Sequence, residues 1–218
     1  MHRPYRVVAG PGSHEIEIKK SRFICTIIRA TTDEEARAFI SDLKKQYWDA
    51  NHNCSAYILG ERGQIQRSSD DGEPSGTAGI PMLGVLQKQE VTDTVAVVTR
   101  YFGGTLLGAG GLIRAYGGAV SATLAKIGLV EIQPRLVVAI DAPYVEAGRL
   151  ENALRTTEFL LKDVDYGNAV TLTLQTTSEE LPLLREWVAQ ATNGACDVIE
   201  MGEEFVEVPV ATEREPHE

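Results

Sequence analysis

The sequence has few of the features that mark membrane, secreted or disulfide-stabilised proteins. No apolar run reaches the roughly 18 to 20 residues that a membrane span needs, and the most apolar region, residues 95–125, contains two arginines. The first 20 residues lack the apolar core of a signal peptide. The cysteines are odd in number and widely spaced, at Cys25, Cys54 and Cys196, which disfavours a disulfide framework and a structural zinc site. We therefore expect a cytoplasmic protein that does not contact a membrane.

Positive charge is scarce in the last third of the chain. Residues 1–133 contain 15 Lys and Arg and 14 Asp and Glu, whereas residues 134–218 contain 6 and 17. Because phosphate binding needs clustered cations, we expect RNA or a ribosome to bind the first part rather than the second. We expect no binding to DNA. The acidic second part is suited to a basic protein partner.

The first part is predicted to mix strands and helices. Strand-like runs occupy residues 14–19 and 22–30, and a helix begins at Thr32, which forms a capping box with Glu35. "CSAYILG" and "QIQRS" are typical of a hairpin, and "DTVAVVTRYF" is typical of a strand buried on both faces. Further helices are expected over residues 77–89 and 110–127. The core stripe of the last helix is predicted to be Ile113, Tyr116, Val120, Leu124 and Ile127.

The second part is predicted to form a separate domain. The boundary is expected at residues 131–136, around Pro134, where the charge changes and the pattern restarts. The pattern is then β-α-β-β-α-β, the order of a ferredoxin-like sandwich, with a hairpin across Gly167–Asn168. We therefore expect an α+β protein with domains at residues 1–133 and 134–210 and a frayed tail at residues 211–218.

Two glycine-rich runs, "GEPSGTAG" and "GGTLLGAGG", each precede a predicted helix. Glycines let backbone N–H groups converge, and a helix start adds unpaired donors and the positive end of the dipole. Arg100 and Arg114 flank the second run, and Arg114 is expected in the first helical turn, so both guanidiniums could face one cleft. The runs therefore predict a site for an anion or a carboxylate, unless they serve only as tight turns and close helix packing. Neither run carries the Lys-Ser/Thr of a P-loop.

Asp70, Asp71 and Glu73 lie in the polar stretch "SSDDGEPSGTAGIP". They could bind a divalent cation such as Mg²⁺ or act as acid and base. They could equally cap the following helix and pair with the two arginines, which is the interpretation that the spacing favours. His52 and Cys54 would share one side of a strand, so a Cys/His nucleophilic pair is conceivable, but cysteine is a common buried strand residue.

The segments "SSDDGEPSGTAGIP" and "VVTRYFGGTLLGAGGLIRAYG" closely resemble the two signature segments of the IMPACT family. "HNCSAY" resembles the strand that precedes them in that family. The resemblance covers essentially the whole chain and identifies it as a bacterial, YigZ-type member. It implies a ribosomal protein S5 domain-2-like fold for the first part. It implies a ferredoxin-like second part, similar to the last domain of a translocating elongation factor, which agrees with the predicted order of elements.

The function that the resemblance implies is less specific than its motifs. Eukaryotic members regulate translation by competing for an activator of a stress kinase, but the extra N-terminal domain that they carry is lacking here, so we do not expect that partner. Bacterial members are proposed, on fold analogy, to bind nucleic acid or to act near the ribosome.

We therefore predict a binding or regulatory protein of translation or RNA, with an anion- or phosphate-binding cleft between the two signature segments. The candidate site residues are Asp70, Asp71, Gly72, Glu73, Gly76, Thr77, Arg100, Tyr101, Phe102, Gly103, Gly104, Gly110, Gly111 and Arg114. His52, Cys54 and Arg67 are secondary candidates. The alternatives are an enzyme acting on a small phosphorylated or carboxylated substrate, and an adaptor that binds proteins through its acidic second part. No residue is predicted to be catalytic.

Overall fold

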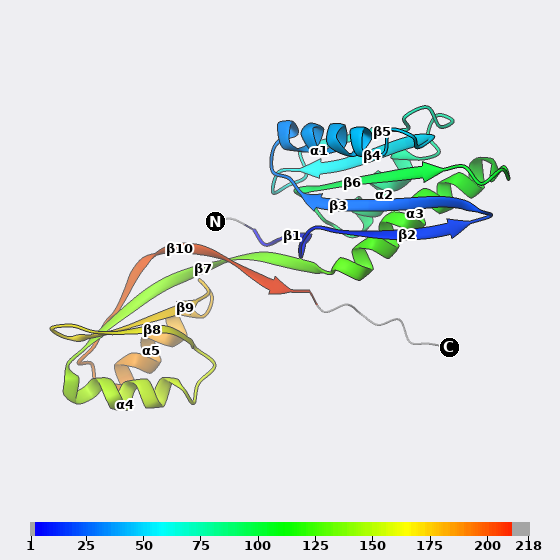
Figure 1. Cartoon of the computed structure of the whole chain (residues 1–218). Helices are drawn as coiled ribbons and strands as arrows, with labels where there is room; N and C mark the ends of the chain where they lie inside the picture. The colour runs from blue at the N-terminus through cyan, green and yellow to red at the C-terminus, as the bar shows by residue number, and fades with distance from the viewer. Residues whose placement is uncertain (1–2, 211–218) are drawn as a thin grey trace, which may run out of the picture. The chain divides into compact units, whose positions relative to one another are not determined.

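The computed structural model describes residues 3–210, and these divide into two compact units. One unit consists of residues 3–132 together with residues 207–210, and the other consists of residues 133–206. Both contain helices packed on antiparallel strands, which confirms the predicted α+β class (Figure 1). The tail predicted at residues 211–218 lies outside the described residues. None of the described helices is long and apolar enough to cross a membrane.

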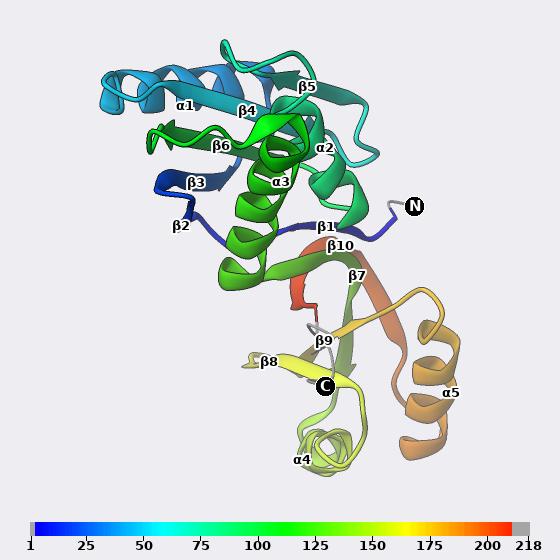
Figure 2. The same cartoon turned by 90° about the vertical axis from the view of Figure 1, so that its right-hand side faces the viewer.

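The first unit is built on a five-stranded sheet with three helices. The strands lie in the order β2 (Gly12–Ile18), β3 (Ser21–Arg29), β6 (Thr94–Tyr101), β4 (His52–Leu59) and β5 (Ile65–Ser69). Helix α1 (Asp33–Gln46) covers one face, and α2 (Gly79–Lys88) and α3 (Gly108–Ile127) cover the other, as the two views in Figures 1 and 2 show. The larger apolar core lies between the sheet and the α2–α3 pair.

Local sequence signals explain most of these elements. The Thr32 side chain accepts a hydrogen bond from the Glu35 N–H at 3.2 Å and so caps α1, as the capping box predicts. Strand β6 is buried along nearly all its length because helices cover both faces of the sheet.

The start of α3 differs from the prediction. It begins at Gly108, two residues earlier than expected, which places Arg114 in the second turn. The predicted core position Ile113 is wrong, because that side chain is 45% exposed and Leu112 is buried in its place.

The second unit has the predicted β-α-β-β-α-β order. Its elements are β7 (Leu129–Ala142), α4 (Tyr144–Leu154), β8 (Leu160–Tyr166), β9 (Val170–Thr176), α5 (Leu181–Ala191) and β10 (Val198–Pro209). The strands lie in the order β10-β7-β9-β8, as in a ferredoxin-like sheet. The two-residue hairpin is wrong. Tyr166 pairs with Val170, so residues 167–169 form a three-residue loop, in which the Gly167 N–H bonds to the Ala169 carbonyl at 3.0 Å.

Two long strands connect the units. Strand β7 passes through Pro134 without a break: residues 129–132 pair with β1 (Tyr5–Val8), and residues 136–142 pair with β9. Strand β10 then returns residues 207–210 to the first unit. There, Arg29 makes a two-pronged ion pair with Glu207, at 2.5 and 2.9 Å, and also donates to the Val8 and Ala9 carbonyls.

Candidate functional site

Several segments of the first unit meet at one end of its sheet. His52 at the start of β4 pairs with Arg100 near the end of β6, and Tyr101 pairs with Arg22 at the start of β3. The β2–β3 turn therefore lies at this same end (Figure 1). The loop between β5 and α2 and the loop between β6 and α3 also begin here, so the fold brings the two glycine-rich runs together.

A cleft of about 440 Å³ lies between these two runs. Its polar side chains come from Asn51, His52, Glu73 and Arg100, and its apolar surface comes from Phe102, Leu106 and Leu112. The start of α3 lines it through Leu107, Gly108 and Ala109. Helix α3 has no side-chain cap and no acidic residue in its first turn. Its first N–H groups therefore have no side-chain acceptor from a cap and carry the positive end of the helix dipole.

A buried ion pair forms the polar centre of the cleft. The Arg100 Nη1 donates to Glu73 Oε1 at 2.5 Å, and both residues are more than nine-tenths buried. The Tyr116 hydroxyl donates to the same oxygen at 2.7 Å. Burial, followed by the neighbouring Cys54 and Glu73, raises the pKa of Tyr116, so the hydroxyl stays protonated as a donor.

Arg100 has one donor that nothing satisfies. The guanidinium lies over the rings of Phe23 and Phe102, 5.3 and 5.6 Å from their centroids. Its Nε is buried and is the one buried side-chain nitrogen or oxygen among residues 3–210 without a hydrogen-bond partner. An unsatisfied buried donor is costly, so this atom distinguishes the cleft from an ordinary packed core.

The three carboxylates of the first segment have separate structural partners. Asp70 accepts hydrogen bonds from the backbone N–H groups of Gly76, Ala78 and Gly79, at 2.8 to 3.0 Å. Burial opposes ionisation of Asp70, but these donors outweigh it and hold its pKa below the ordinary value. Asp71 accepts from the Lys44 ammonium at 2.5 Å and from the Asn53 N–H at 2.6 Å.

The capping-and-pairing interpretation therefore holds for Asp70 as the cap of the α2 start and for Glu73 as the partner of Arg100. The expectation that Asp70 and Asp71 balance the arginines is wrong, since their oxygens are turned to backbone N–H groups and Lys44. Among residues 3–210, no group of three or more His, Cys, Asp or Glu side chains could hold a metal ion.

His52 and Cys54 do not form a nucleophilic pair. The Cys54 thiol donates to the Asp70 carbonyl at 3.0 Å, and burial raises its pKa to about 12, so the thiol stays protonated near neutral pH. The His52 Nδ1 lies 2.8 Å from the Asp71 carbonyl, and its Nε2 lies 3.9 Å from Glu73 Oε1. Because a carbonyl only accepts, Nδ1 carries the proton.

The other predicted residues of the second segment have different roles. Phe102 lines the cleft, while the Tyr101 hydroxyl bonds to Asp49 at 2.9 Å. Gly103 is packed so closely that a Cβ would lie 2.0 Å from the Lys20 carbonyl carbon. Gly104 adopts a φ of +83°, which favours glycine.

The expectation that Arg114 shares the cleft with Arg100 is wrong. Arg114 lies in the second turn of α3, where it is exposed and is not among the lining residues. Gly110 and Gly111 lie in the first turn of α3. Arg67 lies on β5, where its guanidinium bonds to the Gln66 carbonyl.

The remaining residues of the first segment shape its loop. Gly72 and Gly76 adopt left-handed φ values of +87° and +77°, and the buried Thr77 donates its hydroxyl to the Pro74 carbonyl at 2.6 Å. Sequence reasoning missed seven lining residues, namely Asn51, Pro74, Leu106, Leu107, Gly108, Ala109 and Leu112, and it assigned Tyr116 only to the core.

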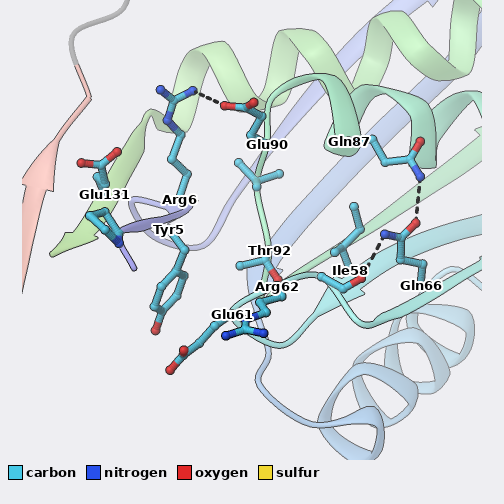
Figure 3. A pocket seen from close by; sticks show the side chains of 13 residues that line it. Tyr5, Arg6, Ile58, Glu61, Arg62, Gln66, Gln87, Glu90, Thr92 and Glu131 are labelled. Atoms are coloured by element: carbon cyan, nitrogen blue, oxygen red, sulfur yellow. Dashed lines mark hydrogen bonds and ion pairs between the residues drawn. The ribbon is translucent and has the colours of Figure 1, made fainter. Parts of the chain in front are cut away.

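A second cavity, of about 420 Å³, lies in the first unit near the β4–β5 hairpin and the end of α2 (Figure 3). Two pairs of its polar side chains contact each other. Arg6 contacts Glu90 at 3.3 Å, and Gln87 donates to Gln66 at 2.8 Å. None of its described side chains has a buried unpaired donor or acceptor, so the first cleft is the stronger candidate for a ligand site.

Comparison with known proteins places the chain in a family. Residues 19–124 match the model of the Impact N-terminal domain, and residues 140–195 match a domain of unknown function, DUF1949. The chain is 50% identical over 200 residues to the IMPACT family member YvyE of Bacillus subtilis, covering 92% of each chain. It is 33% identical over 199 residues to the IMPACT family member YigZ of Escherichia coli, covering 90% of this chain and 98% of that protein.

A solved crystal structure of a protein described as hypothetical is also similar. It is 32% identical, and the match covers 94% of this chain and 100% of that chain with a TM-score of 0.58. The two domain matches and the near-complete coverage of two relatives agree with each other, and the chain belongs to the IMPACT family.

Proposed function

We propose that this protein is a regulatory binding protein of translation or RNA whose cleft holds an anionic group. The observation that carries the proposal is the unpaired Nε of Arg100, which is buried in a residue that lines the cleft. If the Arg100 side chain repacked when a ligand bound, a ligand oxygen would accept a hydrogen bond from this Nε. The connection with translation or RNA rests on the family resemblance alone.

The charge of the anion would be met mainly by the start of α3. Glu73 already neutralises Arg100, so the arginine contributes a donor more than a net charge. Helix α3 is 20 residues long and its first turn is uncapped at Leu107, Gly108 and Ala109, which line the cleft. Such a helix start supplies backbone N–H donors and a partial positive charge for a phosphate or a carboxylate.

Binding is favoured over catalysis by the chemistry of the residues in and behind the cleft wall. The Cys54 thiol has a pKa of about 12 and is therefore a poor nucleophile. Backbone N–H groups occupy the Asp70 carboxylate, and Glu73 Oε1 accepts from both Arg100 and Tyr116. An anion that binds here would meet donors and apolar walls rather than an activated nucleophile.

The test places a fixed carboxylate at the start of α3. Ala109→Asp should leave the fold as stable as before, because an acidic side chain in the first turn complements the helix dipole. It should abolish binding of AMP, followed by NMR titration, and co-sedimentation with ribosomes or RNA. Ala109→Asn, which has the same size without the charge, should retain both. Equal binding by the two variants, or no binding by the parent, would overturn the proposal.

A further inference from the structure

The turn between β2 and β3 is built from two lysines in an unfavourable backbone conformation. Ile18 pairs with Ser21, so Lys19 and Lys20 form a two-residue hairpin connection. Their φ values are +48° and +66°, both in the left-handed region. Turns of this kind normally use Asn-Gly, because the left-handed region is open to glycine and tolerated by asparagine but strained for a lysine side chain.

Both lysine side chains are exposed and unpaired. Among residues 3–210, neither ammonium takes part in an ion pair or a side-chain hydrogen bond. Residues held in strained conformations often serve a function that the strain makes possible. Here a two-residue turn with an uncommon composition presents two free positive charges side by side.

The lysine turn lies directly beside the cleft. A Cβ on Gly103 would lie 2.0 Å from the Lys20 carbonyl carbon and 2.4 Å from the Ser21 nitrogen, so the two backbones are in close contact. The Gly103 N–H also donates to the Ser21 hydroxyl at 3.1 Å. Because Gly103 follows Phe102, a lining residue, the turn and the cleft form one continuous edge of the unit.

The chain on the other side of this edge carries no negative charge. Residues 94–130 contain no Asp or Glu, although they contain Arg100, Arg114 and Lys126. Near the turn, Glu15 is held by Arg22 at 2.8 and 3.0 Å, and the exposed Glu17 lies opposite Arg22 in the hairpin. Phe102 is 45% exposed at the rim and offers ring surface to a flat group. Cations beside an exposed aromatic ring are the combination that binds single-stranded nucleic acid.

We infer that the lysine turn extends the cleft into a binding site for single-stranded RNA. One phosphate would lie at the start of α3, a neighbouring phosphate would contact Lys19 and Lys20, and a base would stack on Phe102. This inference rests on the proposed function, since it takes the anion in the cleft to be one phosphate of a chain. It adds the class of ligand and a second point of contact.

The experiment uses the full chain with the substitutions Lys19→Asn and Lys20→Gly. These give the turn the residues that its conformation favours, so the melting temperature should rise by roughly 2–5 °C. Each phosphate contact on a single strand contributes about 0.7 to the slope of log affinity against log salt. Loss of the one phosphate contact that the two lysines share should lower that slope by about 0.7 and weaken binding of an eight-nucleotide oligouridylate roughly fivefold at 0.1 M salt.

A matched control removes two charges elsewhere on the same unit. Arg62 and Lys88 are exposed, and they lie near the second cavity rather than the cleft. The variant Arg62→Gln, Lys88→Gln should bind the oligonucleotide within about twofold of the parent, because only local charges contact the phosphates. AMP, which carries one phosphate group, should bind all of these variants alike.

The outcomes separate this inference from the proposed function. A turn variant that is more stable and binds RNA as tightly as the parent, with the same salt slope, would show that the lysines serve only the turn. AMP binding that is lost in Ala109→Asp, together with an oligonucleotide that binds no tighter than AMP, would overturn the RNA site and leave the anion cleft intact. No binding of either probe would overturn both.

Discussion

The ion pair between Glu73 and Arg100 can be tested by a double-mutant cycle. Glu73→Gln leaves the Arg100 charge buried at 6% exposure without a compensating carboxylate. Arg100 already has one unsatisfied nitrogen, so little remains to offset the loss. Removing one partner of a buried pair costs about 3–5 kcal/mol, which corresponds to a fall in melting temperature of roughly 6–20 °C for a chain of this size.

Replacing both partners should restore most of the stability. Glu73→Leu with Arg100→Met removes both desolvated charges and fills similar volume, and such replacements are often neutral or stabilising. We expect the double variant to unfold within about 1 kcal/mol of the parent. The Tyr116 hydroxyl, which donates to Glu73, would lose its acceptor and prevent full recovery.

The assay is chemical denaturation of the parent, of Glu73→Gln, of Glu73→Leu and Arg100→Met singly, and of the double variant, with AMP binding measured in parallel. A ligand site requires the double variant to be folded but unable to bind. The reasoning would be refuted if Glu73→Gln cost less than about 1 kcal/mol, because the cleft would then be solvated enough to tolerate a lone charge. It would also be refuted if the double variant were as unstable as the single variant.

Three further outcomes follow from the same geometry. Asp70→Asn should lower the free energy of unfolding by about 1–2 kcal/mol at pH 7, because it weakens a cap with three donors. Since folding lowers the pKa of Asp70, this loss relative to the parent should be complete above the ordinary Asp pKa of 3.8 and should shrink as the pH falls below it, which acid unfolding would measure. Arg114→Ala should change stability by no more than about 0.5 kcal/mol, because the side chain is exposed and outside the cleft; a loss of several kcal/mol in a denaturant titration would contradict this placement. Gly103→Ala should lower the free energy of unfolding by about 1–3 kcal/mol, because a Cβ would collide with the Lys20 backbone. Gly118→Ala in α3 should raise it by about 0.5–1 kcal/mol, because a Cβ there has nothing within 4 Å, and calorimetry would compare the two variants.

The order of elements could be predicted because hydrophobic periodicity and caps act locally. Strand β6 and the Thr32 cap are encoded within a few neighbouring residues, and so is the second unit's alternation of strands and helices. The sequence predicts the start of α3 two residues late, because a glycine such as Gly108 is typical of loops. Tertiary packing, which the local sequence does not show, decides where the helix begins. Arg114 therefore lies in the second turn rather than the first, and it does not line the cleft.

The cleft itself was only partly predictable. Two glycine-rich runs before helices indicated its walls, but the pairing of Glu73 with Arg100 joins residues 27 positions apart and depends on sheet order. Tyr116 was assigned to the core because its helical spacing is that of a core residue, and it is indeed buried. Only the three-dimensional structure shows that its hydroxyl also serves the site.

The return of β10 has a consequence for the order in which the protein folds during synthesis. Residues 207–210 belong to the first unit, where Glu207 meets Arg29 and the Val210 N–H donates to the Leu129 carbonyl at 3.0 Å. The second unit is thus inserted into the first along the chain, between Ile132 and Glu207. At about 5–20 residues per second, a ribosome needs several seconds to make the insert after the first 132 residues have been made. During that interval the Arg29 guanidinium has no Glu207 to bind. The first unit can be completed by residues 207–210 only after the second unit has been translated.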